Sequence, residues 1–284
     1  MKKLTEELIE VINGLFEESE KGHLEVLKSY MQSKDKTINY FNNLFIKLGK
    51  EGKIEYADLL KYNRLDSIEK FLKEEAESSI KEEIAITTLI FMLLYSRTYF
   101  QVAYTFEKVL GIRVNFKILK DELIESIVKM NWNGIIFDER IRNNHLSLAN
   151  KLRTDFADSV RKGETMDLVA SKVEKQFGLH YSYSTSLLIT EGSRIIGAAE
   201  EDIFRDSKIV EGVEFSAVLD NRTTEFCRGH DGRRYRLDDP NKPFLPAHIR
   251  CRSMWLPILI NTIEEIYYND SFEPFDEWLD ENIY

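Results

Sequence analysis

The chain of 284 residues contains only two cysteines, Cys227 and Cys251. Two cysteines are too few for a disulfide framework, so the composition favours a reducing compartment. The longest apolar stretch, residues 84–95, contains two threonines and is too short to span a bilayer. The first residues, MKKLTEELIE, lack the apolar run of a signal peptide. We therefore expect a soluble protein with no membrane partner.

Proline is absent before Pro240, so no proline forces a helix to break in residues 1–239. Apolar residues recur at helical spacing from the start of the chain, as in Leu4, Leu8, Ile12 and Leu15. Residues 1–125 are therefore predicted to form an N-terminal helical region. Within it, Asp35 or Thr37 is expected to cap a helix that ends at Gly49. The charged run 70–83 is typical of a solvated helix face.

A second helical region is predicted for residues 126–208, after a polar turn around Gly134. Residues 162–165, with the sequence KGET, indicate a helix stop followed by a new cap. The stripe that precedes them consists of Leu148, Leu152, Phe156 and Val160. The stripe that follows consists of Leu168, Val169, Val173 and Phe177, and we expect it to end at Gly178. A further helix is predicted for residues 181–205.

The pattern changes after Gly212, where Val213, Phe215, Ala217 and Leu219 alternate with other residues. This period of two predicts a strand, and short β-compatible runs follow at residues 233–237 and 254–259. The predicted fold class is α+β, with a mainly α-helical body followed by a small β-rich Cys/His module at residues 209–260. Residues 261–284 would form an acidic, aromatic tail.

Basic residues are absent from residues 253–284, which contain eight acidic residues. An acidic tail with interleaved aromatic side chains suits docking on a partner. The alternative is a terminal arm that packs on its own domain. The whole chain carries a net charge of −10, which weighs against non-specific binding of nucleic acid by the entire surface but leaves room for a local basic patch.

Each cysteine lies three residues from a histidine, in the order Cys227-x-x-His230, seventeen residues, His248-x-x-Cys251. Zinc prefers four ligands in a tetrahedron, and two close pairs can each span one edge of it. The spacing indicates a structural zinc site. The alternatives are a catalytic metal, or two buried thiols with two exposed histidines. Three prolines in the insert argue against a recognition helix.

A longer ordered set of residues surrounds this pattern. It reads Asp220-x-Arg222-Thr223-x-x-x-Cys227, Asp231-Gly232-x-x-Tyr235 and Pro246-x-His248-x-x-Cys251-Arg252. Upstream residues belong to the same set, namely Trp132-x-Gly134, Glu139-Arg140-Ile141 and Thr190-Glu191. Together they resemble the phage Mu F-like minor head proteins, also called head morphogenesis proteins, of tailed phages, over residues 100–260.

The resemblance implies a non-enzymatic component of the virion or procapsid interior, present in the host cytoplasm during assembly. Such a protein would associate with the portal vertex, act in head assembly, and handle or eject packaged DNA. Its partners would be the portal protein, the major capsid protein or both, and also phage DNA, with no small-molecule substrate. The family pattern has cysteines where this chain has Thr224 and Ser253. Its ligands here would then be Cys227, His248 and Cys251, with His230 as the candidate replacement.

The other residues between Asp220 and Arg252 are assigned candidate roles by residue type. The structural motif comprises Asp220, Arg222, Thr223, Asp231, Gly232 and Arg252. Arginines that could contact DNA phosphates are Arg228, Arg233, Arg234, Arg236 and Arg250. Lys242 is also basic, and these side chains could equally pair with nearby aspartates. The alternative functions are a metal-dependent, HNH-like nuclease, in which His248 acts with Asp220 or Asp231, and a zinc-stabilised DNA-binding module.

The other three histidines, His23, His145 and His180, stand singly in polar surroundings. We expect them to be solvated surface residues. No glycine-rich phosphate loop, serine-centred elbow or paired carboxylate site is evident, so no catalytic residue is assigned.

Overall fold

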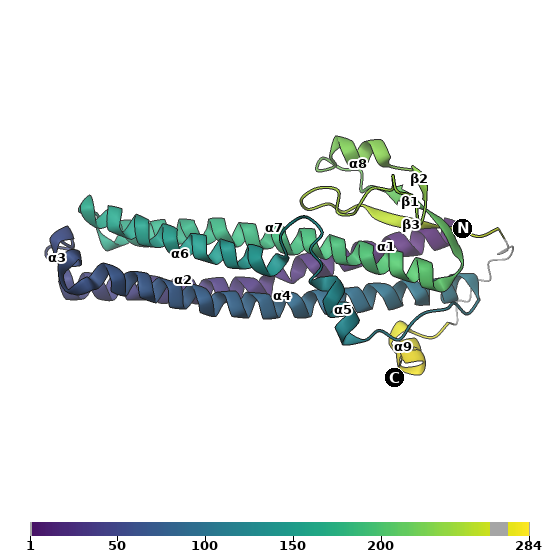
Figure 1. Cartoon of the computed structure of the whole chain (residues 1–284), viewed down its shortest axis with the longest axis horizontal. Helices are drawn as coiled ribbons and strands as arrows, with labels where there is room; N and C mark the ends of the chain where they lie inside the picture. Colours follow the sequence, from purple (N-terminus) through teal and green to yellow (C-terminus); the bar gives the residue numbers. More distant parts are fainter. Residues whose placement is uncertain (1, 262–271, 284) are drawn as a thin grey trace. The chain divides into compact units, whose positions relative to one another are not determined.

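The computed structural model describes residues 2–261 and 272–283. Its helices are α1 (Lys2–Lys21), α2 (His23–Leu48), α3 (Tyr56–Leu60), the 3-10 helix η1 (Lys61–Asn63), α4 (Arg64–Leu110), α5 (Asp121–Val128), α6 (Phe137–Arg161), α7 (Met166–Ser207), α8 (Glu225–His230) and α9 (Phe275–Ile283). Its strands are β1 (Val210–Ser216), β2 (Arg234–Arg236) and β3 (Met254–Leu259). The predicted helical body with a small β-rich module is confirmed, and Figure 1 shows the three strands grouped beside α8.

The chain divides into two compact units, each built from segments that are far apart in sequence. Unit 1 comprises residues 1–21, 88–130 and 187–284, and unit 2 comprises residues 22–87 and 131–186. The long helices α4 and α7 contribute residues to both units. All three strands, and with them both cysteines, belong to unit 1.

Several predicted helix features are confirmed, namely a glycine stop, the break between two helices and two buried apolar stripes. Helix α2 ends before Gly49. The KGET sequence separates α6 from α7. The α1 and α6 stripes are buried, with exposed fractions of 4% or less for Leu4, Leu8, Ile12, Leu15, Leu148, Leu152, Phe156 and Val160.

Two predicted helix boundaries are wrong. Helix α2 runs through Asp35 and Thr37, and the Thr37 hydroxyl donates to the Ser33 carbonyl inside the helix (2.8 Å) instead of capping a new one. Helix α7 likewise continues through Gly178 to Ser207. A glycine within a helix costs only about 1 kcal/mol, which burial of Phe177 before it and Leu188 after it outweighs.

In unit 2, the solvated-surface prediction is wrong for His145 and His180. His145 is 4% exposed, and its Nε2 lies 2.6 Å from Oε2 of Glu83. His180 is 7% exposed, and its Nδ1 lies 2.7 Å from Oδ1 of Asn144. Glu83 closes the charged run 70–83 and is itself buried. These polar partners are distant in sequence, so local composition does not show that the histidines are buried.

The sheet has the order β2-β1-β3 and both pairings are antiparallel. Strand β3 lies at an edge of the sheet. A proline cannot donate a ladder hydrogen bond, so Pro257 is tolerated there because an edge strand has a partner on one side only. The sheet buries Trp255, whose ring centroid lies 5.4 Å from that of Phe215. Strand β1 begins earlier than predicted and ends at Ser216, so Leu219 lies beyond it and is 56% exposed.

The described part of the predicted tail packs on unit 1. Trp278 of α9 is fully buried, and its ring centroid lies 5.8 Å from that of Tyr104. This favours the packed-arm alternative for α9. Residues 262–271 and 284 lie outside the described residues, so docking of that part on a partner stays a prediction. None of the described helices is long and apolar enough to cross a membrane.

Candidate functional site

Asp220 organises the turn of the Cys/His module that follows β1. Its carboxylate accepts from the Arg222 backbone N–H (2.8 Å) and is paired with the Arg252 guanidinium. The Arg252 side chain holds the pKa of Asp220 at about 2, helped by the Arg222 backbone bond. Thr223 accepts from the Asp220 backbone N–H (2.8 Å) and donates to the Val218 carbonyl. These four motif residues therefore fix the loop that leads into α8.

Asp231 and Gly232 shape the exit from α8. The Asp231 carboxylate accepts from the Ala217 backbone N–H (2.9 Å). Gly232 has a φ of +75°, a conformation that L side chains rarely adopt, and its N–H donates to the Phe215 carbonyl (2.8 Å). The Asp231-Gly232 pair thus turns the chain back toward β1, as a structural role requires.

Cys227, His248 and Cys251 are brought together, with one ligand atom from each lying within 4.8 Å of the others. The two sulfurs are 3.9 Å apart, and both cysteines are buried. Thr224 caps α8 by accepting from the Cys227 backbone N–H (3.4 Å). Cys227 comes from this helix, whereas His248 and Cys251 come from the loop before β3.

The hydroxyls of Ser253 and Thr224 lie near the Cys227 thiol and affect its pKa. Burial raises the pKa of this thiol, and the two hydroxyls oppose that rise because they stabilise the thiolate. These are the two positions at which the resemblance implies further cysteines. The fold therefore places both substituted positions at the sulfur of Cys227.

His230 is not part of the group of possible ligands among the described residues. Its Nδ1 lies 2.8 Å from the Phe226 carbonyl, and its ring stacks on Phe226 with the centroids 4.0 Å apart. Asp220 and Asp231, which the nuclease alternative requires near His248, are also outside the group. Both carboxylates are engaged in the turn contacts described above.

Helix α7 anchors the loop before β3, which carries His248 and Cys251, through two residues one turn apart. The Ser193 hydroxyl donates to the Cys251 carbonyl (2.6 Å), and the Thr190 hydroxyl accepts from the Arg250 backbone N–H (3.0 Å). Sequence reasoning singled out Thr190 but missed Ser193. A serine within the apolar part of α7 gives no signal of a tertiary contact with a loop 58 residues away.

A buried ion pair on the same part of α7 was also missed. Arg194 donates to Glu191 (2.8 Å) and to the carbonyls of Ile127 and Val128 (3.0 and 2.8 Å), which end α5. Both charged side chains are 2% exposed or less. The one feature of the sequence that indicates burial of Arg194 is its position directly before Ile195 and Ile196, which are both buried. The Thr190-Glu191 pair thus contributes to two different tertiary contacts.

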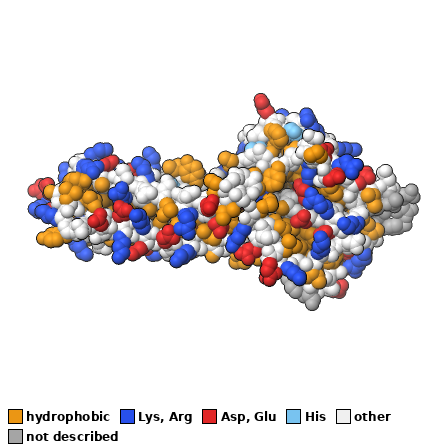
Figure 2. All heavy atoms as spheres, viewed as in Figure 1, with side chains coloured by type: hydrophobic (Ala, Val, Ile, Leu, Met, Phe, Trp, Pro, Cys, Tyr) orange, Lys and Arg blue, Asp and Glu red, His pale blue; other side chains and the backbone are white. Residues whose placement is uncertain are grey.

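The five arginines predicted as DNA contacts are all exposed, and several of them pair with residues of the module. Arg234 pairs with Glu214 (2.8 Å), and Arg236 pairs with Asp238 (3.1 Å). Arg228 donates to the Asp220 carbonyl (3.2 Å). On the face drawn in Figure 2, basic and acidic side chains are interspersed. The arginines are therefore available on the surface, and several of them already have local acidic or carbonyl partners.

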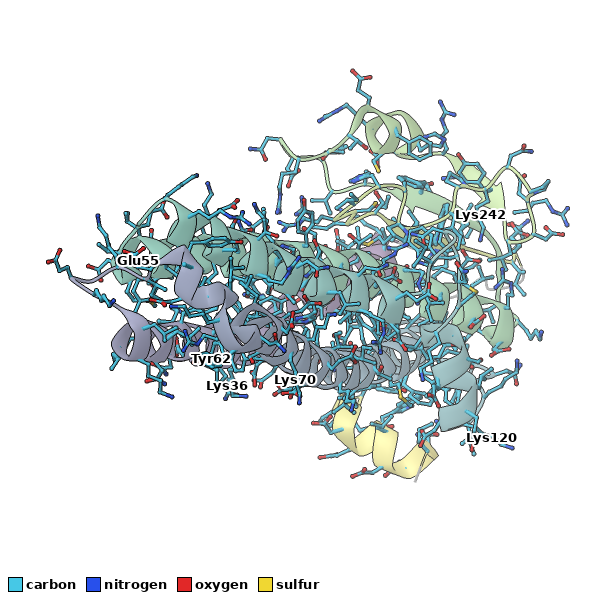
Figure 3. All side chains as sticks on the ribbon, turned by 60° about the vertical axis from the view of Figure 1, so that its left-hand side comes forward. Lys36, Glu55, Tyr62, Lys70, Lys120 and Lys242 are labelled. Carbon is cyan, nitrogen blue, oxygen red and sulfur yellow. The ribbon has the colours of Figure 1, made fainter. Side chains whose placement is uncertain are left out.

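Lys242 differs from the arginines. Its side chain, labelled in Figure 3, is 9% exposed, and its ammonium lies 2.7 Å from Glu201 of α7. The ammonium also lies 5.2 Å from the centroid of the Trp255 ring. Lys242 therefore fixes the proline-rich insert onto α7 and the sheet, and it is less accessible to a phosphate than the exposed arginines.

The segment that contains the Cys/His module is similar to known proteins. The profile of the family described as "Phage Mu protein F like protein" matches residues 150–256, from α6 to β3. The chain is 25% identical over 239 residues to minor head protein GP7 of Bacillus phage SPP1, covering 82% of this chain and 76% of that protein. No solved structure matches. Residues 150–256 are thus similar to the phage Mu F-like family, and most of the chain is similar to a phage minor head protein.

Proposed function

We propose that the chain is a non-enzymatic minor head protein that associates with the portal vertex and handles or ejects packaged DNA. The observation that carries the proposal is the family match over residues 150–256, which covers α7 and the Cys/His module fixed to it. The similar protein of phage SPP1 is named a minor head protein. We infer the portal protein, the major capsid protein or both as partners. The chain would act in the interior of the procapsid and virion after synthesis in the host cytoplasm.

Contact with DNA is proposed for the exposed arginines of the module. Arg233 and Arg250 are exposed and lie on either side of Pro240, Pro243 and Pro246 in the sequence. Arg228, Arg234 and Arg236 could exchange their weak surface partners for phosphates, because exposed ion pairs contribute little free energy. Phosphate contacts of this kind give binding that weakens steeply with salt.

A structural zinc ion is proposed for Cys227, His248 and Cys251. Two thiolates bound to a tetrahedral zinc ion at about 2.3 Å lie about 3.8 Å apart, and the two sulfurs here are 3.9 Å apart. The residues therefore fit the ion without rearrangement of the pair. The ion would tie α8 to the loop before β3, which supports the module as a structural unit.

The particle proposal is tested by expressing the chain with the portal and capsid proteins of its own phage. Isolated procapsids should contain the chain in a low, reproducible number of copies that remains after a salt wash. Omission of the portal protein should remove it from particles if the vertex is its site. Consistent absence of the chain from washed procapsids would overturn the proposal.

The zinc proposal is tested by elemental analysis of the purified chain. We expect about one zinc per chain, loss of the ion in Cys227→Ser, and retention in His230→Gln. The second variant is the matched control because His230 lies outside the ligand group. Equal zinc contents in the wild type and in Cys227→Ser would contradict the assignment.

A further inference from the structure

The three ligands leave one position of a tetrahedral ion without a protein ligand. Within the part of the chain that the structure describes, no other histidine, cysteine or carboxylate joins Cys227, His248 and Cys251. Structural zinc sites are closed by four protein ligands, whereas sites with three retain an exchangeable position. Serine and threonine hydroxyls are not among the usual zinc ligands, so Thr224 and Ser253 do not close this site in the way that cysteines would.

The histidine is oriented in a way that suits ligation. Nδ1 of His248 lies 2.9 Å from the Ile249 carbonyl. A carbonyl oxygen only accepts, so Nδ1 donates and the lone pair of the neutral ring is on Nε2. Donation from the second ring nitrogen to a carbonyl is the usual way in which proteins orient a ligating histidine.

The space beside the ligands accommodates a small molecule. A cavity of about 20 Å³ is lined by Cys227 and His248 and also by Val218, Arg222, Thr223, Arg250, Arg252 and Ser253. A cavity needs roughly 10–15 Å³ to hold one water molecule. The cavity is therefore large enough for one water or a small anion bound through one atom, and too small for a further side chain.

The charges around the cavity favour an anion. Three of the lining residues are arginines, and the single carboxylate of Asp220 pairs with both Arg252 and Arg222. An ion bound by two thiolates and a neutral imidazole has no net charge, because zinc carries two positive charges and each thiolate carries one negative charge. The positive charge beside the cavity thus comes from the arginines, and it attracts a small anion more than it attracts a cation.

We propose that the metal site of this chain is open, and that its fourth position takes solvent that exchanges with a small inorganic anion. The proposal rests on the metal assignment made above. Binding of the ion releases the two thiol protons to solvent, and entry of the anion displaces the solvent ligand without oxidation or reduction. The arginines that line the cavity make this position selective for anions over neutral molecules.

Cobalt(II) reports this position directly because its visible spectrum depends on its ligands. The full chain is loaded with cobalt, and sodium azide is added while the spectrum is recorded. We expect saturable changes in the d–d bands with azide and none with an equal concentration of sodium perchlorate. A cobalt spectrum that azide leaves unchanged would overturn the open position while leaving the metal assignment intact. Failure to bind cobalt or zinc would overturn both.

Two substitutions at Ser253 separate the open site from a general perturbation. Ser253→Cys supplies a further thiolate at a position that lines the same cavity as Cys227. This variant should show stronger sulfur-to-cobalt charge-transfer absorption and no response to azide. Ser253→Ala removes only the hydroxyl and should keep the azide response, with metal affinity weaker by about tenfold. An azide response that persists unchanged in a cobalt-loaded Ser253→Cys variant would contradict the proposal.

Discussion

The indole N–H of Trp278 donates to Oε2 of Glu107 across 2.9 Å, although 171 positions separate the two residues. Both side chains are buried, and Oε1 of Glu107 also accepts from the Val114 backbone N–H (3.0 Å). The bond joins the C-terminal helix α9 to the end of α4. The aromatic tail therefore serves the stability of unit 1, at least through α9.

This contact predicts a large loss of stability for Trp278→Ala. The substitution leaves a cavity and removes a donor from a buried carboxylate, so the free energy of unfolding should fall by about 3–5 kcal/mol. Urea denaturation followed by circular dichroism measures it. The matched control is Leu89→Ala on α4, because Leu89 is 59% exposed and its removal should change stability by less than about 0.5 kcal/mol. Similar decreases in both variants would contradict the packing of α9.

The buried ion pair of α7 predicts non-additive effects. Arg194→Met leaves Glu191 buried without its partner and leaves the last carbonyls of α5 without donors, which should cost about 3–5 kcal/mol. The double variant Glu191→Gln with Arg194→Met should recover about 1 kcal/mol or more, because the uncompensated charge is gone. A double-mutant cycle measured by denaturation tests this. Strict additivity of the two substitutions would show that the residues do not interact.

The histidine buried in unit 2 predicts a decline in stability in mild acid. Burial lowers the pKa of His180, and the charge of His145 lowers it further. The ordinary value in an unfolded chain is about 6.5. As the pH falls below this value, the unfolded chain takes up a proton that folded His180 resists, so the free energy of unfolding decreases. Above this value both states are neutral and the effect is absent.

Urea denaturation at several pH values between about 5 and 7.5 measures this decline. The wild type should lose stability toward the acidic end, and His180→Gln should lose less. The control is His23→Gln, which should retain the full decline of the wild type. Parallel curves for the wild type and His180→Gln would contradict the role given to burial of His180.

If the exposed arginines of the Cys/His module bind DNA phosphates, we expect their substitution to change the salt dependence of DNA binding. The double substitution Arg233→Gln with Arg234→Gln should lower the slope of log affinity against log salt by about 1 for each phosphate that is no longer bound. Fluorescence anisotropy with labelled duplex DNA at several salt concentrations measures it. Arg142→Gln with Arg153→Gln in α6 removes the same charge from unit 2. An equal change in slope in both double variants would indicate a general charge effect.

Local patterns predicted those parts of the fold that local physics controls. The α1 and α6 stripes, the stop between α6 and α7, and the short strands β2 and β3 follow from periodicity and from turn residues that act within a few positions. Gly178 misled because an isolated glycine weakens a helix by less than the burial on either side of it stabilises the helix. The burial of His145 and His180 could not be predicted, because their partners Glu83 and Asn144 lie on other helices, α4 and α6 respectively.

The sequence by itself determined the helical body, the small sheet, the family resemblance and three ligands of the candidate site, because each depends on residue type and short spacing. Tertiary structure decided which residues meet. It excluded His230 from the ligand group, placed Thr224 and Ser253 at the Cys227 sulfur, and buried Lys242 against Glu201. These outcomes depend on contacts between α7, α8 and the loop before β3. Spacing along the chain does not specify such contacts, because close packing brings together residues that are far apart in sequence.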